Sequence, residues 1–213
     1  MKKKLFFSFL PLFLLSQQGI TQNTDIDPRE RLTFGVKAGI NYSNVWDKQG
    51  QEFQADPIVG FAGGVFVLIP VGMFAGIQPE FLISQKGFQG SGTLLGSQYS
   101  FSRVTTFIDI PVLFEIKPAP FLFIVLGPQY SFLLTEKNEY TFGANSTVQQ
   151  QEFDNDNVRN GIFGFTAGID INIQHIVISG RACWDLQKNN SNGSNYTPRY
   201  NNQWLQFTLG YKL

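Results

Sequence analysis

The sequence predicts an all-β protein, an eight-stranded antiparallel up-and-down transmembrane β-barrel. Three observations lead to this prediction: apolar side chains alternate with small or polar ones, short and long connections alternate along the chain, and the number of alternating segments is even. Alternation with a period of two places the two kinds of side chain on opposite faces of a strand. Bacterial membrane barrels join an even number of strands by short periplasmic turns and long extracellular loops.

The composition excludes several other classes of protein. Charged residues make up 15% of the 213 residues and aromatic residues 15%, whereas soluble domains contain roughly 25% charged residues. One cysteine and one histidine cannot form an internal disulfide or a Cys/His zinc site. After the first fifteen residues, no apolar run approaches the roughly 18–20 residues of a membrane-spanning helix.

The N-terminal segment has the pattern of a secretory signal peptide. Three lysines at positions 2–4 precede an apolar run from Leu5 to Leu15, which is too short for a membrane anchor. We expect a signal peptide over residues 1–21, a short periplasmic segment over 22–31 and the barrel domain over 32–213. The remaining chain has 13 basic and 16 acidic side chains, a net charge of −3, so it offers no electrostatic footprint for nucleic acid.

The first strand shows the pattern most clearly. From Leu32 to Tyr42, apolar side chains occupy the even positions, and Thr, Gly, Lys and Asn occupy the odd ones. Eleven residues at about 3.4 Å each, tilted by about 45°, rise by roughly 26 Å. That height matches the apolar band of an outer-membrane barrel.

Seven further segments continue the pattern. The segment Ile58–Ile69 is apolar or glycine-rich on both faces, so its inward face is left unassigned, whereas the others alternate with varying clarity. The predicted strands after the first are Ile58–Ile69, Met73–Gln85, Tyr99–Ile116, Phe121–Leu134, Gly161–Ile173, Ile176–Leu186 and Gln203–Leu213.

The connections alternate in length. Three are tight turns: Pro70–Gly72, Lys117–Pro120 and Gln174–His175. Four are long and polar, and we predict them to be extracellular loops: Ser43–Pro57, Lys86–Gln98, Thr135–Asn160 and Gln187–Asn202.

A soluble lipocalin-like barrel would also alternate, with its apolar face inside. The bulky face here lacks charges, whereas the other face carries Gly, Ser, Thr and occasional charges, which suits a narrow wet lumen. Aromatic residues gather near both ends of the strands, as at the two bilayer interfaces. Those near the long loops are Tyr42, Tyr99, Tyr130, Phe132, Phe163 and Trp184, and those near the turns are Phe34, Phe114, Phe121 and Tyr211. A membrane barrel is therefore favoured, closed by pairing of the last strand with the first.

The candidate site is a set of charged residues on the inward face. We predict a lumen charge network of Lys37, Glu80, Arg103, Asp109, Glu115, Asp170, Arg181, Asp185 and Lys212. Four positive and five negative charges nearly neutralise one another, and ion pairing would satisfy them in a buried lumen. The alternatives are a proton or ion path, or a ligand pocket.

No catalytic constellation is evident, and we predict no enzymatic activity, no cofactor and no metal site. His175 falls in a tight turn, where a solvated residue is expected, and Cys183 faces the lumen beside Arg181 and Asp185, where an inert thiol is expected. The interior of an eight-stranded barrel is about filled by its own side chains, so a permanent diffusion pore is not expected.

Several strand motifs resemble the PorT-like outer-membrane β-barrel family, across nearly all of the chain after residue 21. They are Phe34-Gly-Val-Lys-Ala-Gly-Ile-Asn-Tyr-Ser-Asn-Val45, Gln78-Pro-Glu-Phe-Leu-Ile-Ser-Gln-Lys-Gly87, Ile108-Asp-Ile-Pro-Val-Leu113, Gly127-Pro-Gln-Tyr130 and Leu209-Gly-Tyr-Lys-Leu213. The resemblance implies an eight-stranded outer-membrane barrel, and its name-giving member is associated with the type IX protein secretion system.

We therefore expect export to the outer membrane and a structural or partner-binding role, which the resemblance links to type IX protein secretion. The alternative is small-solute transport by a porin-like barrel. The expected partners are outer-membrane lipid and lipopolysaccharide, the barrel assembly machinery, and secretion-system or envelope proteins.

Overall fold

The computed structural model describes residues 27–49, 55–94, 97–142, 145–152, 159–189 and 199–213. The predicted signal peptide, residues 1–21, lies outside these residues. The described residues contain one short 3₁₀ helix and nine strands. They are η1 (Pro28–Glu30), β1 (Thr33–Gln49), β2 (Asp56–Pro70), β3 (Ala75–Leu94), β4 (Ser97–Ala119), β5 (Leu122–Phe142), β6 (Asn145–Glu152), β7 (Gly161–Ile173), β8 (Ile176–Asp185) and β9 (Arg199–Lys212). None of the helices in this described part is long and apolar enough to cross a membrane.

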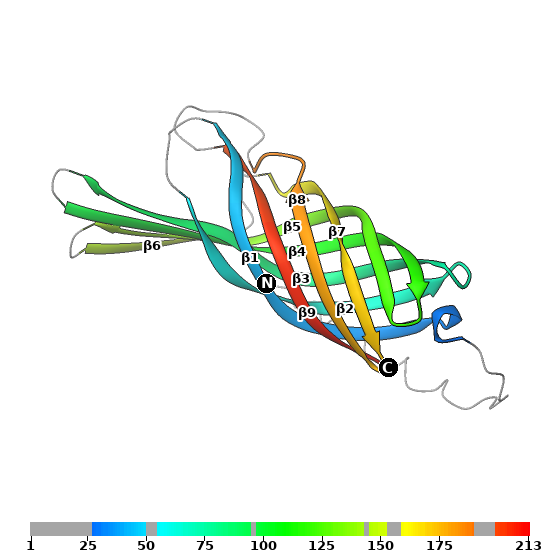
Figure 1. Ribbon diagram of the computed structural model, residues 1–213. Coiled ribbons are helices and arrows are strands. Elements are labelled where there is room, and N and C mark those ends of the chain that lie inside the picture. Colours follow the sequence, from blue (N-terminus) through cyan, green and yellow to red (C-terminus); the bar gives the residue numbers. More distant parts are fainter. Residues whose placement is uncertain (1–26, 50–54, 95–96, 143–144, 153–158, 190–198) are drawn as a thin grey trace, which may run out of the picture.

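Eight of the strands form a closed antiparallel ring, which confirms the predicted fold class. The order around the ring is β1, β2, β3, β4, β5, β7, β8, β9 and back to β1 (Figure 1). The closing pair β1–β9 runs from Gly35 opposite Lys212 to Gln49 opposite Arg199. Because the ring has no open edge, its backbone groups are paired within the sheet, as a lipid environment requires.

The short turns β2–β3, β4–β5 and β7–β8 lie at the end of the barrel where β1 begins and β9 ends. η1 lies at the same end (Figure 1). This is the periplasmic end, and the opposite end carries the longer, extracellular connections.

Three strands continue far beyond the ring, in contrast to the strand ends that the sequence predicts. β3, β4 and β5 contain 20, 23 and 21 residues, and β6 pairs with the far half of β5 outside the ring. The four strands project from the barrel as a sheet, which we call the extracellular sheet (Figure 1). The prediction that Lys86–Gln98 and Thr135–Asn160 are loops is therefore wrong over most of their described residues. The side chains there are polar, as in a loop, but the backbone of these segments pairs with the neighbouring strands.

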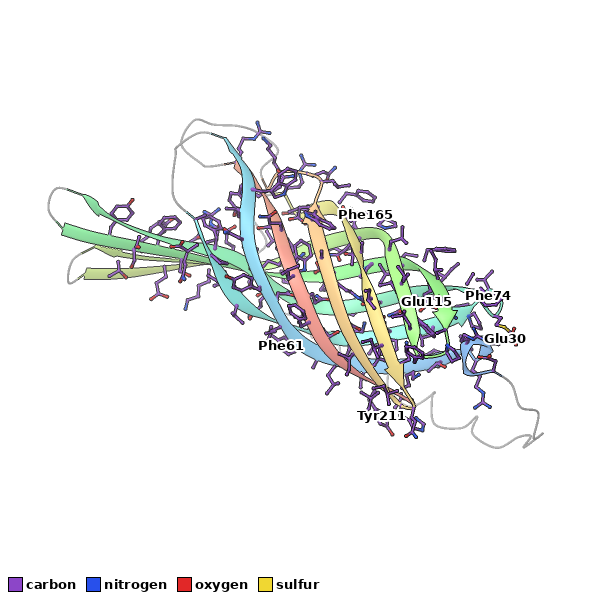
Figure 2. All side chains as sticks on the ribbon, in the orientation of Figure 1. Glu30, Phe61, Phe74, Glu115, Phe165 and Tyr211 are labelled. Carbon is purple, nitrogen blue, oxygen red and sulfur yellow. The ribbon has the colours of Figure 1, made fainter. Side chains whose placement is uncertain are left out.

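Inward side chains are buried and outward side chains are exposed along each ring strand. The outward face is apolar, with Val36 on β1, Ile83 on β3 and Ile169 on β7 among many exposed large apolar residues. Phe61 and Tyr211, labelled in Figure 2, belong to the same exposed apolar set. An apolar surface of this extent fits contact with lipid rather than water. The structure also assigns the faces of β2, because Phe66 and Leu68 point inward and are buried while Val65 points outward.

The predicted aromatic belts hold for most residues but not for Tyr99. Tyr130 and Phe163 are exposed on the outward face and pair directly across β5 and β7. Tyr99 instead pairs with Gly92 and Phe142 near the tip of the extracellular sheet. It lies outside the predicted belt because β4 begins at Ser97, well beyond the ring.

A β-bulge interrupts the alternation in β5. Thr106 pairs with Thr135 and the next residue, Phe107, pairs with Leu133, so Leu134 is an extra residue in the ladder. Leu133 points inward and is only 5% exposed, and beyond the bulge the even-numbered residues take the inward face. From Thr135 onward, the single extra residue exchanges the two faces of the strand relative to strict alternation.

Candidate functional site: the lumen charge network

Four of the predicted residues form one buried cluster in the middle of the barrel. The Nζ atom of Lys37 on β1 donates to Glu80 Oε1 on β3 at 2.8 Å. Arg181 Nη1 on β8 donates to Glu80 Oε2 at 2.8 Å, and Arg181 Nη2 donates to Asp170 on β7 at 2.9 and 3.2 Å. None of the four side chains is more than 1% exposed. We call these residues the central cluster.

The central cluster spans the whole width of the barrel. Glu80 and Arg181 belong to β3 and β8, which are four strands apart in either direction around the eight-stranded ring. Two positive and two negative charges make the cluster neutral, and Gln78 Nε2 also donates to Glu80 Oε1 at 2.5 Å. The attraction within a buried ion pair offsets the free-energy cost of desolvation only when the geometry is this close and additional hydrogen bonds are made. Gly168 on β7 pairs with Arg181, and its missing side chain leaves the space that the arginine side chain occupies.

A second cluster lies nearer the extracellular end and contains Lys86, which is absent from the predicted set. Lys86 Nζ donates to Asp109 Oδ1 at 2.9 Å and to Ser131 Oγ at 3.1 Å. The same ammonium group lies 3.8 Å from the ring centroid of Trp204 on β9, an interaction of the cation–π type. Asp185 accepts a hydrogen bond of 2.6 Å from Asn202 Nδ2.

A third pair lies at the periplasmic end. Lys117 Nζ is 3.2 Å from Glu115 Oε2, and both side chains are buried. Lys117 also donates to the backbone oxygen of Arg29 in η1 at 2.9 Å, which ties this helix to the barrel. The guanidinium of Arg29 stands 5.4 Å from the ring centroid of Phe74, and Figure 2 shows Phe74, Glu115 and Glu30 together at this end.

An apolar layer separates the central cluster from this periplasmic pair. Lys37 lies 4.9 Å from the ring centroid of Phe66, and Lys117 lies 5.2 Å from that of Phe123. The layer consists of Phe66, Leu68, Leu113, Phe123, Val125 and Val177. The expectation of a wet lumen lined by small and polar residues therefore fails at this level, because β2, β4 and β5 turn large apolar side chains inward.

A second contact between opposite walls of the barrel lies at the extracellular end of the lumen. Arg103 on β4 donates to Asn138 Oδ1 at 2.7 Å and to Tyr200 Oη on β9 at 3.1 Å, and it lies 3.5 Å from Glu136. The rings of Phe88 and Tyr200 meet edge to face at a centroid distance of 5.0 Å. β4 and β9 are also four strands apart in the ring, so this contact joins opposite walls.

The structure divides the nine predicted residues among several clusters instead of joining them in one network. Lys37, Glu80, Asp170 and Arg181 meet in the centre, and Asp109 and Asp185 line the level above it. Glu115 and Arg103 belong to the periplasmic and extracellular ends. Lys212 is half-buried at the periplasmic rim, where it donates to Asn172 Oδ1 at 3.2 Å.

Lys86, Lys117 and Glu136 are absent from the predicted set, because all three fall in segments that the sequence predicts to be connections. A signal for the first two was present, since Lys86 follows Ser84 and Lys117 follows Glu115 at the spacing of one strand face. Glu136 had no such signal, because the bulge at Leu134 moves it to the inward face.

His175 and Cys183 occupy the positions that the sequence predicts. His175 is exposed in the turn between β7 and β8, and its ring stacks on Tyr211 at a centroid distance of 5.7 Å. Cys183 is 1% exposed inside the lumen, where it pairs with Thr166 and Trp204 in the neighbouring strands.

The comparison with protein families decides the class of this barrel. Residues 16–191 match the sequence profile of the outer membrane protein beta-barrel domain. The chain belongs to this family. As an outer-membrane barrel, it presents its outward apolar face to the outer membrane and lies in contact with lipid and lipopolysaccharide.

Solved outer-membrane barrels resemble the chain in fold at low sequence identity. Ail, the attachment invasion locus protein of Yersinia pestis, is 10% identical over 85% of this chain and 99% of that chain, with a TM-score of 0.45. Neisserial surface protein A is 8% identical over 84% and 97%, with a TM-score of 0.45. The outer membrane protease OmpT from Escherichia coli is 8% identical over 85% and 95%, with a TM-score of 0.43. No curated protein sequence matches the chain significantly.

Proposed function

We propose that this outer-membrane barrel has a structural or partner-binding role and that its lumen does not conduct solutes. The observation that carries the proposal is the contact of Arg181 with Glu80 at 2.8 Å between opposite walls of the barrel. An eight-stranded ring has an interior about wide enough for its own side chains. A contact across its diameter therefore blocks the path of a solute.

Separating the ion pairs of the central cluster would also require a large free energy. Removing one partner from a buried ion pair costs about 3–5 kcal/mol. A solute would have to displace the Arg181–Glu80 contact and then pass both the apolar layer around Phe66 and the Arg103–Tyr200 contact. We infer that the lumen stabilises the barrel and that function resides outside it.

The extracellular sheet offers the surface for a partner. Its strand β6 pairs with β5 and, among the described residues, has no strand on its other side. Such an edge presents unpaired backbone groups to which another chain can add a strand. Tyr140 on β5 adds an aromatic side chain that is 47% exposed, a residue type enriched at binding hot spots.

The partner is proposed to be a protein of the secretion apparatus. The resemblance of the strand motifs to the PorT-like family supports a component of the type IX protein secretion system. The barrel assembly machinery would be a transient partner during insertion. The proposal includes no catalysis, since His175 stands in an exposed turn and Cys183 is buried.

Site-specific photo-crosslinking in living cells tests the partner-binding role. A photoreactive amino acid at Tyr140 should crosslink to a defined protein, whereas the same amino acid at the lipid-facing position Ile169 should not. A secretion component in the Tyr140 adduct would support the link to secretion. Equal yields at both positions, or no protein adduct at Tyr140, would contradict a specific partner on the extracellular sheet.

Recordings in planar lipid bilayers test the alternative of small-solute transport. The purified barrel should insert without discrete conductance steps, because the lumen is crossed in its centre and at its extracellular end. A porin of known conductance, inserted under the same conditions, serves as the control for detection. Regular steps from the purified barrel would favour transport.

A further inference from the structure

The outward face of the extracellular sheet contains a polar hollow outside the barrel. Its volume is about 440 Å³, within the range of 300–1,000 Å³ that is common for small-molecule sites. Residues of β2, β3, β4 and β5 line it. It is therefore separate from the lumen clusters and from the edge of β6.

Two rows of neighbouring side chains form the floor of the hollow. In the first row, Ser100 on β4 lies between Ser91 on β3 and Thr141 on β5. Side chains directly opposite each other in antiparallel strands have Cβ atoms about 4.5–5.5 Å apart, so three hydroxyl groups stand side by side. Short side chains in this row are what leaves the surface hollow.

The second row is longer and carries an amide and a carboxylate. Ser102 on β4 lies between Gln89 on β3 and Glu139 on β5. Asp56 on β2 pairs with Gln89 and adds a second carboxylate at the side of the hollow. Within the described residues, the hydroxyls of the serines and of Thr141 make no hydrogen bond to another side chain or to the backbone.

This set of groups matches the chemistry of a sugar. Hydroxyls both donate and accept hydrogen bonds, a primary amide does the same through two atoms, and carboxylates accept from paired hydroxyls. The two carboxylates disfavour a phosphate or sulfate ligand by repulsion, and Lys137 is already 3.7 Å from Glu139. Apolar ligands find few partners there.

The height of the hollow agrees with this chemistry. On the outward face of β4, Ile108 still belongs to the apolar zone, and Ser102 lies six residues farther out. At about 3.3 Å per residue and a tilt of about 45°, the hollow lies roughly 14 Å beyond Ile108. Sugars of the outer-leaflet glycolipid occupy this zone, beside the wall of the barrel.

From the hollow, its hydroxyl-lined floor and its height, we propose that the outward face around Ser100 is a binding site for saccharide, supplied by the core sugars of lipopolysaccharide. The inference goes beyond the partner-binding role proposed above. A barrel without any protein partner could still bind sugar at this site, and a barrel with a partner could lack it.

Isothermal titration calorimetry on the whole barrel in lipid nanodiscs tests the site with three probes. The probes are intact lipopolysaccharide of the source bacterium, the oligosaccharide released from it by mild acid, and the lipid portion without core sugars. The matched variants are Ser100→Phe, which fills the hollow, and Thr106→Phe, which places the same ring on the same face of β4 six residues closer to the membrane. Asp56→Asn with Glu139→Gln keeps the shape of the site and removes its charges.

We expect the intact lipopolysaccharide and the released oligosaccharide to bind, and the lipid portion to bind at least tenfold more weakly. Ser100→Phe should weaken oligosaccharide binding at least tenfold, and Thr106→Phe should leave it within twofold. Binding of the oligosaccharide alone would assign the site to free glycans while keeping its sugar chemistry. Equal binding of the lipid portion, unchanged affinity in Ser100→Phe, or no binding of any probe would overturn the proposal. Because the assay contains no other protein, its outcome is independent of the crosslinking at Tyr140.

Discussion

The guanidinium of Arg181 on β8 meets the carboxylate of Glu80 on β3 at 2.8 Å, across the full width of the eight-stranded ring. Lys37 approaches the same carboxylate from β1, and Asp170 holds the other side of the guanidinium. Because every charge in this cluster has an opposite partner within 3 Å, four ionised groups can be buried together. We propose that this arrangement both stabilises the barrel and closes its lumen.

Replacement of Arg181 should therefore be strongly destabilising. Arg181→Met leaves Glu80 and Asp170 with only Lys37 for compensation, and we expect the free energy of unfolding to fall by about 3–5 kcal/mol. Urea unfolding of the barrel refolded in lipid vesicles measures this change.

Two further variants isolate the role of charge. Arg181→Met combined with Asp170→Asn restores neutrality and should recover most of the lost stability. Lys137→Met removes an exposed ion pair with Glu139 and should change stability by less than about 1 kcal/mol. A loss as small in Arg181→Met as in Lys137→Met would show that the central cluster does not hold the barrel.

The N-terminal cap of η1 gives a prediction about pH. Hydrogen bonds from Arg29 to the carboxylate of Asp27 lower the pKa of Asp27 to about 2, from an ordinary value of about 3.9. A lowered pKa means that the cap contributes its stability fully above about pH 4 and loses it as the pH falls through about 2.

Titration of the Asp27 carboxyl carbon by NMR should show this midpoint near 2. In Arg29→Gln, which removes the guanidinium hydrogen bonds, the midpoint should return toward about 3.9. A midpoint near 4 in the unmodified chain would mean that Arg29 does not hold the carboxylate.

The bulge at Leu134 predicts an unusual tolerance to deletion. Without Leu134, Leu133 still points inward and Thr135 still points outward, so both halves of β5 keep their faces. We expect the deletion variant to fold with a melting temperature, followed by circular dichroism, close to that of the unmodified barrel.

Deletion of Lys137 is the matched control. It turns Asn138 from the lumen to the outside and breaks the hydrogen bond of 2.7 Å from Arg103. Loss of a hydrogen bond to a charged group costs about 1.5–3 kcal/mol. Equal stability of the two deletion variants would show that the bulge does not set the faces of the extracellular sheet.

Much of the fold follows from the sequence, because lipid on one side of a closed sheet imposes a strict period of two. The alternation in residues 32–42 and 203–213 predicts both the faces of β1 and β9 and their pairing, which the structure confirms. The length of β3 to β5 does not follow in the same way. Beyond the membrane both faces of a strand meet water, so the residues around Ser91 and Ser100 resemble those of a loop.

The candidate site could be predicted as a set of inward residues but not as a set of contacts. Period-two spacing places Glu80 and Arg181 on the inward face, whereas their contact depends on which strands lie opposite in the ring. The inward position of Phe66 and Leu68 had no signal, since β2 is apolar on both faces. The inward position of Glu136 could not be predicted, because it depends on the bulge at Leu134 and no local sequence feature indicates that bulge.

The accessibility of Cys183 to a small water-soluble thiol reagent tests most directly the claim that the lumen is closed. This thiol belongs to the only cysteine of the chain and lies between the Arg181–Glu80 and Arg103–Tyr200 crossings. In intact cells and in vesicles open to both sides, a charged methanethiosulfonate reagent should leave Cys183 unlabelled until urea unfolds the barrel. Ser100→Cys in a Cys183→Ser background should label at once, as the control for access to the outward surface. Labelling of Cys183 at a rate comparable with Ser100→Cys would contradict a closed lumen.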